Sequence, residues 1–301
     1  MEQEKKKNNK KIIVICGIVL LVIVLLAVFF TRFNNMSVTK NDTNMVNNKE
    51  SKEEYTTLLK DVVKIGDYVV YESIEEDFTM TKNETGDSTD LKFNTNEYKD
   101  NWRAMYNDDE NGLQIISTTG VTHRLTLEGK FGYNNAVDTL NSFCNHYANN
   151  KDYAISGRCL GSNPTSSKDS AGTQEHFSAG ALKVADENYR KDLEVINNNS
   201  LHSGGERTLL ASRYIDQKSG LNNYYLRYIT SSGDLENNSR ILYSTATTPE
   251  IEAGVKNYYS MNTNKGYMVS GESVRAIITL KQDVKVKGGD GTKDNPYLLA
   301  K

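Results

Sequence analysis

The sequence predicts a membrane-spanning helix near its N-terminus, followed by one α+β domain whose sheet is mainly antiparallel. Three observations predict this arrangement. Residues 12–30 form one uninterrupted apolar run, and residues 31–64 are polar. From residue 65 onward, short segments with strand-like character are separated by turns, and only two longer stretches have helical periodicity. Strands that are grouped apart from helices are typical of the α+β class.

The apolar run from Ile12 to Phe30 has nineteen residues without a charge or a proline. As a helix it would be about 28 Å long, which matches a bilayer core of ~30 Å. Five lysines precede the run and only Arg32 follows it closely, so the positive-inside rule places the N-terminus in the cytoplasm and the C-terminal domain outside. We therefore expect a single-pass protein of the cell membrane, with the lipid bilayer as the partner of this segment.

Two other interpretations of this segment stay open. A cleaved signal peptide has an apolar core of ~7–15 residues and small residues at its cleavage site. The run is longer than that, and Ala27-Val28-Phe29 is a poor cleavage site. Lipidation of Cys16 would need a small residue before it, where this chain has the bulky Ile15. A retained signal anchor fits the run better than either alternative.

The charge distribution excludes one class of partner for the outer domain. The chain has 36 basic and 39 acidic residues, and five of the lysines lie before the apolar run. Without these lysines, Arg32 and the two glutamates that precede the run, 30 basic and 37 acidic residues remain, so the outer portion is acidic with a formal charge near −7. A nucleic-acid-binding domain needs a basic surface to neutralise phosphates, so we expect no nucleic-acid partner. Three prolines and many asparagines and lysines are typical of a bacterial protein from an AT-rich gene.

Four segments follow one another along the chain. They are a cytoplasmic basic segment at 1–11, a transmembrane signal anchor at 12–30, a polar stalk at 31–64 and an extracytoplasmic α+β domain at 65–301. The first part of the stalk, Thr31–Glu50, has almost no apolar periodicity and cannot bury enough surface to order itself. Ser51–Val63 has the apolar spacing and the N-terminal Ser and Glu of a short amphipathic helix.

The outer domain is predicted to contain two helices and at least nine strands. The first helix spans about Asn134 to Tyr147, with an apolar face that includes Leu140 and Phe143, and the second spans about Lys183 to Ile196. The strand candidates are Asp67–Glu72, Asn101–Tyr106, Leu113–Ser117, Arg124–Leu127, Leu209–Ile215, Asn223–Thr230, Arg240–Ser244, Ser273–Val284 and Tyr297–Leu299.

Three motifs in the C-terminal third resemble a group of uncharacterised membrane-anchored surface proteins of Gram-positive-type bacteria. Thr208–Arg213 reads TLLASR, which is similar to the YWLASR of that group, and Tyr225–Ile229 matches one of its strands. Ser273–Leu280 reads SVRAIITL, which is similar to its closing strand GVRPVVSL. The resemblance covers most of residues 65–301 and implies a C-type-lectin-like fold. The chain departs from the group at Thr208 and Leu209, which replace an aromatic pair, and at Ser273 and Ala276, which replace Gly and Pro.

Cys144 and Cys159 are the only cysteines after the apolar run. On the oxidising side of a membrane, an even count of two predicts a disulfide. Two free buried thiols and a nucleophilic Cys159 are the alternatives. The nucleophile hypothesis draws on Ser156-Gly-Arg-Cys159, which is similar to the Ser-x-Gly-Cys of bacterial L,D-transpeptidases, although Arg158 replaces the Gly before the Cys.

No motif in the sequence predicts a cofactor, a metal centre or a serine nucleophile. The four histidines, His123, His146, His176 and His202, are isolated, and zinc needs about four ligands with recognisable spacing. The glycine-rich segment from Gly288 has no Lys-Ser/Thr after it, and His176-Phe-Ser-Ala-Gly180 lacks the first glycine of a nucleophile elbow. We therefore expect no cofactor and no metal.

Eighteen tyrosines against eight phenylalanines and one tryptophan favour rings that bind ligands while tolerating water. The candidate ligand-binding residues are Arg213, Tyr224, Tyr225, Arg227, Tyr228, Tyr243, Tyr258, Tyr259 and Tyr267. The tyrosines either pack a sheet or form a platform for a glycan or peptide of the cell wall or cell surface. The sequence thus predicts a non-catalytic binding or structural module at the cell surface, with a cell-envelope enzyme using Cys159 as the alternative.

Overall fold

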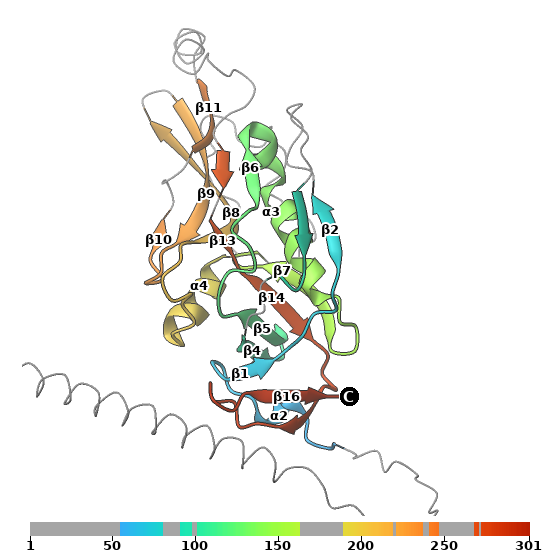
Figure 1. The fold of residues 1–301 in the computed structure, drawn as a ribbon. Helices are drawn as coiled ribbons and strands as arrows, with labels where there is room; N and C mark the ends of the chain where they lie inside the picture. Colours follow the sequence, from blue (N-terminus) through green and yellow to red (C-terminus); the bar gives the residue numbers. More distant parts are fainter. Residues whose placement is uncertain are drawn as a thin grey trace, which may run out of the picture. The chain divides into compact units, whose positions relative to one another are not determined.

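Two β-sheets with helices packed on their faces make up most of the part of the chain that the structure describes (Figure 1). The structure is a computed structural model, and it describes residues 55–80, 91–97, 101–162, 189–218, 221–236, 241–246, 268–270 and 272–301. The chain divides into two units, Met1–Glu53 and Glu54–Lys301, and all described residues belong to the second. The predicted anchor at 12–30 lies outside them, and no helix within them is long and apolar enough to cross a membrane.

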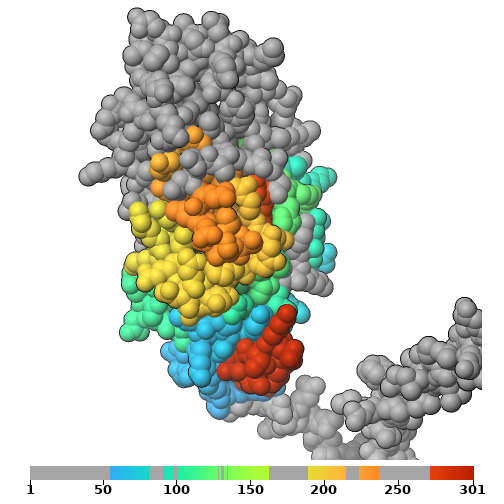
Figure 2. Space-filling model, turned by 90° about the vertical axis from the view of Figure 1, so that its left-hand side faces the viewer, coloured from blue at the N-terminus to red at the C-terminus, as the bar shows by residue number. Residues whose placement is uncertain are grey.

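The larger sheet has seven strands. Their order is β15 (Lys285–Gly288), β16 (Tyr297–Ala300), β1 (Tyr68–Val70), β4 (Trp102–Asp108), β5 (Gly112–Ser117), β14 (Ala276–Leu280) and β7 (Ala154–Cys159). Neighbours are antiparallel except β1 and β16, which pair in parallel. This pairing brings the first strand beside the last, so blue and red residues adjoin at the lower end of Figure 2.

The second sheet has five strands and carries the tyrosine-rich segment. It contains β10 (Leu235–Glu236), β9 (Leu221–Ile229), β8 (Thr208–Lys218) and β13 (Ser273–Val274), with β11 (Ile241–Ala246) also paired to β9. Two small sheets join β6 (Thr126–Glu128) to β12 (Met268–Ser270) and β2 (Asp77–Met80) to β3 (Leu91–Asn94). Sheet therefore predominates over helix in the described residues.

Two helices build two apolar cores. Helix α3 (Gly129–Asn145), continued by the short helix η1 (His146–Ala148), contributes Leu140, Phe143 and Tyr147 to a core with inward-facing residues of both large sheets. Helix α4 (Tyr189–Asn198) packs Tyr189 and Ile196 into a second core with residues such as Met105, Ile116 and Ile277. Adjacent strand residues point to opposite faces, so Ile277 and Ile278 enter different cores.

The mixed α+β class is confirmed, and most predicted strands and both predicted helices are present. The predicted helix Ser51–Val63 is wrong over Tyr55–Leu58, because only Leu59–Val62 (α2) is helical and Leu58 forms an antiparallel bridge to Lys285. The single strand predicted for Ser273–Val284 is also wrong. It is interrupted at Arg275, where the chain passes from the second sheet to the larger one, and it ends at Leu280. The apolar residues continue through this point, so the sequence pattern could not show that the chain changes sheet there.

Candidate functional site

The two cysteines after the apolar run come together from different elements. Cys144 lies in α3 and Cys159 ends β7, both side chains have no exposed surface, and their thiols are free. Burial and a hydrogen bond with Cys159 raise the pKa of Cys144 well above its usual value. A thiol acts as a nucleophile only as thiolate, so this environment is opposite to that of a reactive cysteine. The predicted disulfide stays a prediction, between two thiols that already touch.

The contact between α3 and β7 is built by asparagines. The backbone N–H of Cys159 donates to Asn141 Oδ1 at 2.9 Å, and the N–H of Gly157 donates to Asn145 Oδ1 at 2.8 Å. These two side chains, four residues apart on α3, satisfy two backbone donors on the outer edge of β7. A Cβ at Gly157 would lie 2.7 Å from the carbonyl oxygen of Cys144, so only glycine permits this approach.

Three of the candidate tyrosines lie in the interior. Tyr224 and Tyr228 face the α3 core, where Tyr224 meets the ring of Tyr133 edge to face at 5.1 Å. Tyr225 is also buried, on the opposite face of β9. Tyr243 lies on β11 with its backbone opposite Tyr224. Tyr258, Tyr259 and Tyr267 lie outside the described residues.

The opposite face of the second sheet carries a stack of aromatic rings and one arginine. The guanidinium of Arg227 lies 4.4 Å from the ring centre of Tyr189 in α4 and 5.3 Å from that of Tyr214 in β8. Tyr214 in turn packs against Tyr225 at 6.1 Å. Arg227 also donates to Ser212 Oγ at 2.8 Å, and only 3% of its surface is exposed. The stack connects α4 to the second sheet.

Arg213, the other candidate contact residue, is equally buried on the α3 side, where it lies 5.5 Å from the ring of Tyr133. Thr208 and Leu209 are buried as well. The described candidates in β8 and β9 therefore form the interior of the second sheet. The structure brings them together, but it does not place their polar groups on an open surface.

A buried ion pair, which no sequence pattern predicts, attaches α4 to the larger sheet. Arg158 of β7 contacts both carboxylate oxygens of Asp192, at 2.6 and 2.9 Å. Tyr106 Oη donates to the same carboxylate at 2.9 Å, and so does the backbone N–H of Gly161 at 2.8 Å. Burial alone would lower the pKa of Arg158, but the Asp192 carboxylate outweighs it and leaves the pKa raised. Helical spacing could not predict that Asp192 turns inward.

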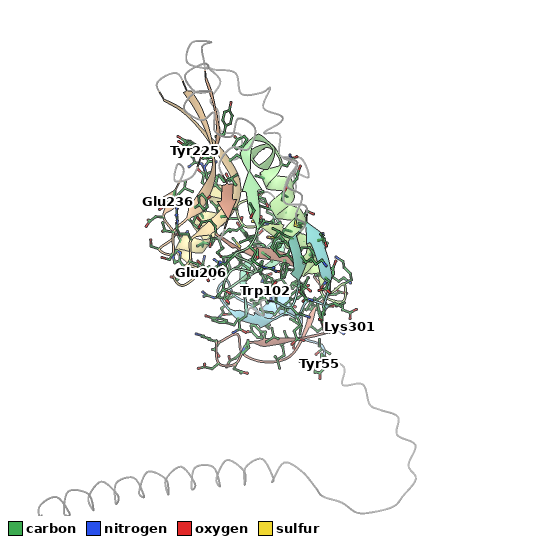
Figure 3. All side chains as sticks on the ribbon, turned by 45° about the horizontal axis from the view of Figure 1, so that its top comes forward. Tyr55, Trp102, Glu206, Tyr225, Glu236 and Lys301 are labelled. Atoms are coloured by element: carbon green, nitrogen blue, oxygen red, sulfur yellow. The ribbon has the colours of Figure 1, made fainter. Side chains whose placement is uncertain are left out.

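Two histidine–glutamate pairs in the described part of the chain are partly exposed to solvent. His146 Nδ1 lies 3.0 Å from Glu76 Oε1, and the imidazole stacks on Phe78 at 3.8 Å. His123 Nε2 lies 3.5 Å from Glu206 Oε1, and Glu206 lies on the same flank as Glu236 (Figure 3). In the described residues no three His, Cys, Asp or Glu side chains are grouped to hold a metal ion. Each pair therefore supplies two possible metal ligands, and its contact holds a loop against the neighbouring segment.

Comparison with known proteins does not assign the chain to a family. No family model, no curated protein and no solved structure matches the chain. The functional argument therefore rests on the placement of the residues described above.

Proposed function

We propose that this chain is a membrane-anchored module on the outer face of a bacterial cell that binds or organises surface components and does not catalyse a reaction. The second sheet is the proposed recognition element, with a glycan or peptide of the cell wall or surface as ligand. The proposal combines the apolar run at 12–30 with the organisation of the folded unit.

One observation carries the proposal: the folded unit has two different ends. Tyr55, where the described chain begins, and Lys301 lie together at one end (Figure 3). Strand β11, which pairs with the first half of β9, lies at the other end (Figure 1). An anchor before Tyr55 would attach the unit at that end and leave the end with β11 free of the attachment. That is where a surface module would meet a ligand.

A C-type-lectin-like fold is the more specific part of the proposal. It rests on the resemblance of SVRAIITL to the closing strand of that group of surface proteins. Arg275 within this motif stands where the chain changes from one large sheet to the other. A motif at a junction of this kind belongs to the architecture of the fold, which supports a shared arrangement of strands more than a shared ligand.

The rival function, an envelope enzyme with Cys159 as nucleophile, has little support from the site. Cys159 has no exposed surface, and its neighbour Cys144 has a raised thiol pKa. Attack on a substrate would require an accessible thiolate with a nearby base. The two sulfurs instead fill the contact between α3 and β7.

The binding proposal is tested with the full chain in lipid nanodiscs, screened against cell-wall glycan fragments and surface peptides. We expect a ligand whose binding is lost in a Tyr243→Ala variant and kept in a Tyr55→Ala variant, because Tyr55 lies at the end opposite β11. Circular dichroism and melting of both variants show whether they fold. Equal binding by both variants would contradict a binding site at β11.

The disulfide proposal is tested by the intact mass of the full chain. The chain is purified from cell membranes and alkylated without reduction. We expect a chain that is two hydrogens lighter and carries at most one adduct, on Cys16, because Cys144 and Cys159 are bridged. On the chain-entropy model, closing this loop stabilises the domain by about 3 kcal/mol. Rapid alkylation of Cys159 in the folded protein would contradict the bridge and revive the nucleophile hypothesis.

A further inference from the structure

The end of the folded unit that contains Tyr55 differs in charge from the rest. Residues 55–70 and 281–301, which build this end, contain seven lysines, five aspartates, no arginine and no glutamate. Residues 71–280 contain twenty basic and twenty-eight acidic residues. A net positive end therefore sits on a domain that is otherwise strongly negative.

These two distant segments are joined by backbone contacts into one surface. The N–H of Leu59 donates to the carbonyl of Val284 at 2.8 Å, and β1 pairs with β16. The N–H of Tyr68 donates to the carbonyl of Gly291, also at 2.8 Å. Figure 2 shows the blue and red segments side by side at the lower end. We call this surface the lysine base; its seven lysines are Lys60, Lys64, Lys281, Lys285, Lys287, Lys293 and Lys301.

The lysine base also exposes apolar side chains. Lys64, Lys287 and Lys293 are exposed, and Lys60 and Lys285 are half-buried. Ile65 is 41% exposed and Leu298 is 38% exposed, and they are two of the four large apolar side chains that are exposed in the described residues. Lysines mixed with exposed apolar groups are the combination found on surfaces that lie against a bilayer.

We propose that the lysine base rests on the anionic lipid surface of the membrane in which the chain is anchored. This inference rests on the proposed anchoring. Positive charge near a bilayer that contains anionic lipids is attracted over roughly one Debye length, about 8–10 Å. A surplus of two lysines would attract a free protein to a bilayer only weakly. A tether to the membrane raises the effective concentration of the lipid surface near the lysine base, which strengthens the contact. The contact would orient the domain, with β8, β9 and β11 directed outward.

Lysine acetylation tests the proposal on the full chain. The chain is placed in nanodiscs of phosphatidylcholine alone or with one third phosphatidylglycerol, treated briefly with an acetylating reagent, and each lysine is quantified by mass spectrometry. We expect Lys64, Lys287 and Lys293 to react about fivefold more slowly in the anionic discs, and the difference to vanish in high salt. Lys191 on α4, which is 66% exposed, is the internal reference and should react equally in both.

A matched pair of variants checks that charge is the cause. In Lys285→Glu, Lys287→Glu, the protection of Lys64 and Lys293 should disappear, whereas Lys191→Glu should leave it unchanged. Equal labelling of the lysine base in the two lipid compositions overturns this inference and leaves the anchored module standing. A chain that does not incorporate into nanodiscs at all overturns the anchoring, and with it both proposals.

Discussion

Arg275 has no exposed surface, and its guanidinium is satisfied by backbone carbonyls. Nε donates to the carbonyl of Ser117 at 2.8 Å, and Nη1 donates to that of Leu201 at 2.7 Å. Ser117 is the last residue of β5, and Leu201 follows α4. The Arg275 side chain therefore connects the point where the chain passes from one sheet to the other with β5 and with the end of α4. A buried carbonyl that loses its donor costs about 1–3 kcal/mol.

Replacement of Arg275 should therefore be strongly destabilising. We expect Arg275→Met to lower the free energy of unfolding by about 3 kcal/mol or more, since two buried carbonyls lose their donor. Arg103→Met is the matched control: Arg103 also donates to two carbonyls, of Gly66 and Ser200, but it is only half-buried. Water can replace the Arg103 guanidinium as the donor there, so Arg103→Met should lower the free energy of unfolding by less than about 1 kcal/mol. Urea unfolding of both variants gives the comparison; equal losses would contradict it.

Ser200 is the one described residue other than glycine with a positive φ, at 52°. It follows α4 in the left-handed position at which helices commonly end with glycine, and the N–H of Leu201 closes the motif on the carbonyl of Ile196 at 2.9 Å. We expect Ser200→Gly to stabilise the protein by about 0.5–1 kcal/mol, because glycine adopts this conformation without strain. Ser200→Ala should give no gain. Thermal melting distinguishes them, and a loss with glycine would refute the argument.

At the scale of elements, α4 is held to the rest of the fold by polar as well as apolar contacts. Its Asp192 pairs with Arg158 of the larger sheet, and its Tyr189 lies under Arg227 of the second sheet. Removing one member of a buried ion pair leaves the other charge uncompensated. Replacing both members can be nearly neutral.

A double-mutant cycle tests this contact. We expect Asp192→Asn and Arg158→Met each to lower stability by about 3–5 kcal/mol, and the double variant to lose much less than their sum. Lys191→Ala removes an exposed ion pair with Glu110 on the same helix and should have no measurable effect. Additive losses at Asp192 and Arg158 would mean that the two groups act independently.

Elements with strong local patterns could be predicted, and those that depend on distant partners could not. The predicted Leu113–Ser117 matches β5 to within one residue, because apolar side chains fill the strand and an Asp-rich turn precedes it. The hairpin of β2 and β3 was missed, since its only buried apolar groups are Phe78 and Phe93, which pack on Phe143 of α3. A pair of isolated aromatics has no periodicity to detect.

For the whole molecule, the buried acids imply a loss of stability in alkali. Burial raises the pKa of Cys144. It is also the largest cause of the raised pKa of Tyr71 and of the raised pKa of Tyr106. A group whose pKa is raised by folding stabilises the fold fully below its unfolded pKa and loses that contribution as the pH rises above it. The usual values are 9.0 for the thiol and 10.0 for the phenols, so the loss should start near pH 9.

The reduced chain should therefore lose stability from pH 9 upward, by at most about 1.4 kcal/mol per pH unit for the thiol. A disulfide between Cys144 and Cys159 has no proton to lose, so the oxidised chain should stay unchanged until about pH 10, where the tyrosines titrate. Melting temperatures between pH 7 and 10.5, with and without reductant, give the two profiles. Coincident profiles would show that the thiols do not contribute.

The sequence by itself determined the alternation of strands and helices in the folded unit, because apolar periodicity and turn residues act locally. It also carried the expectation of an anchor, whereas the pairing of β1 with β16 was needed to group the lysines of the lysine base. Only the tertiary structure decided that SVRAIITL changes sheet at Arg275, that Arg213 and Arg227 are buried, and that Cys144 meets Cys159. The physical reason is that an arginine or tyrosine becomes an interior residue only when distant carbonyls, carboxylates and rings surround it, and no local pattern encodes those partners.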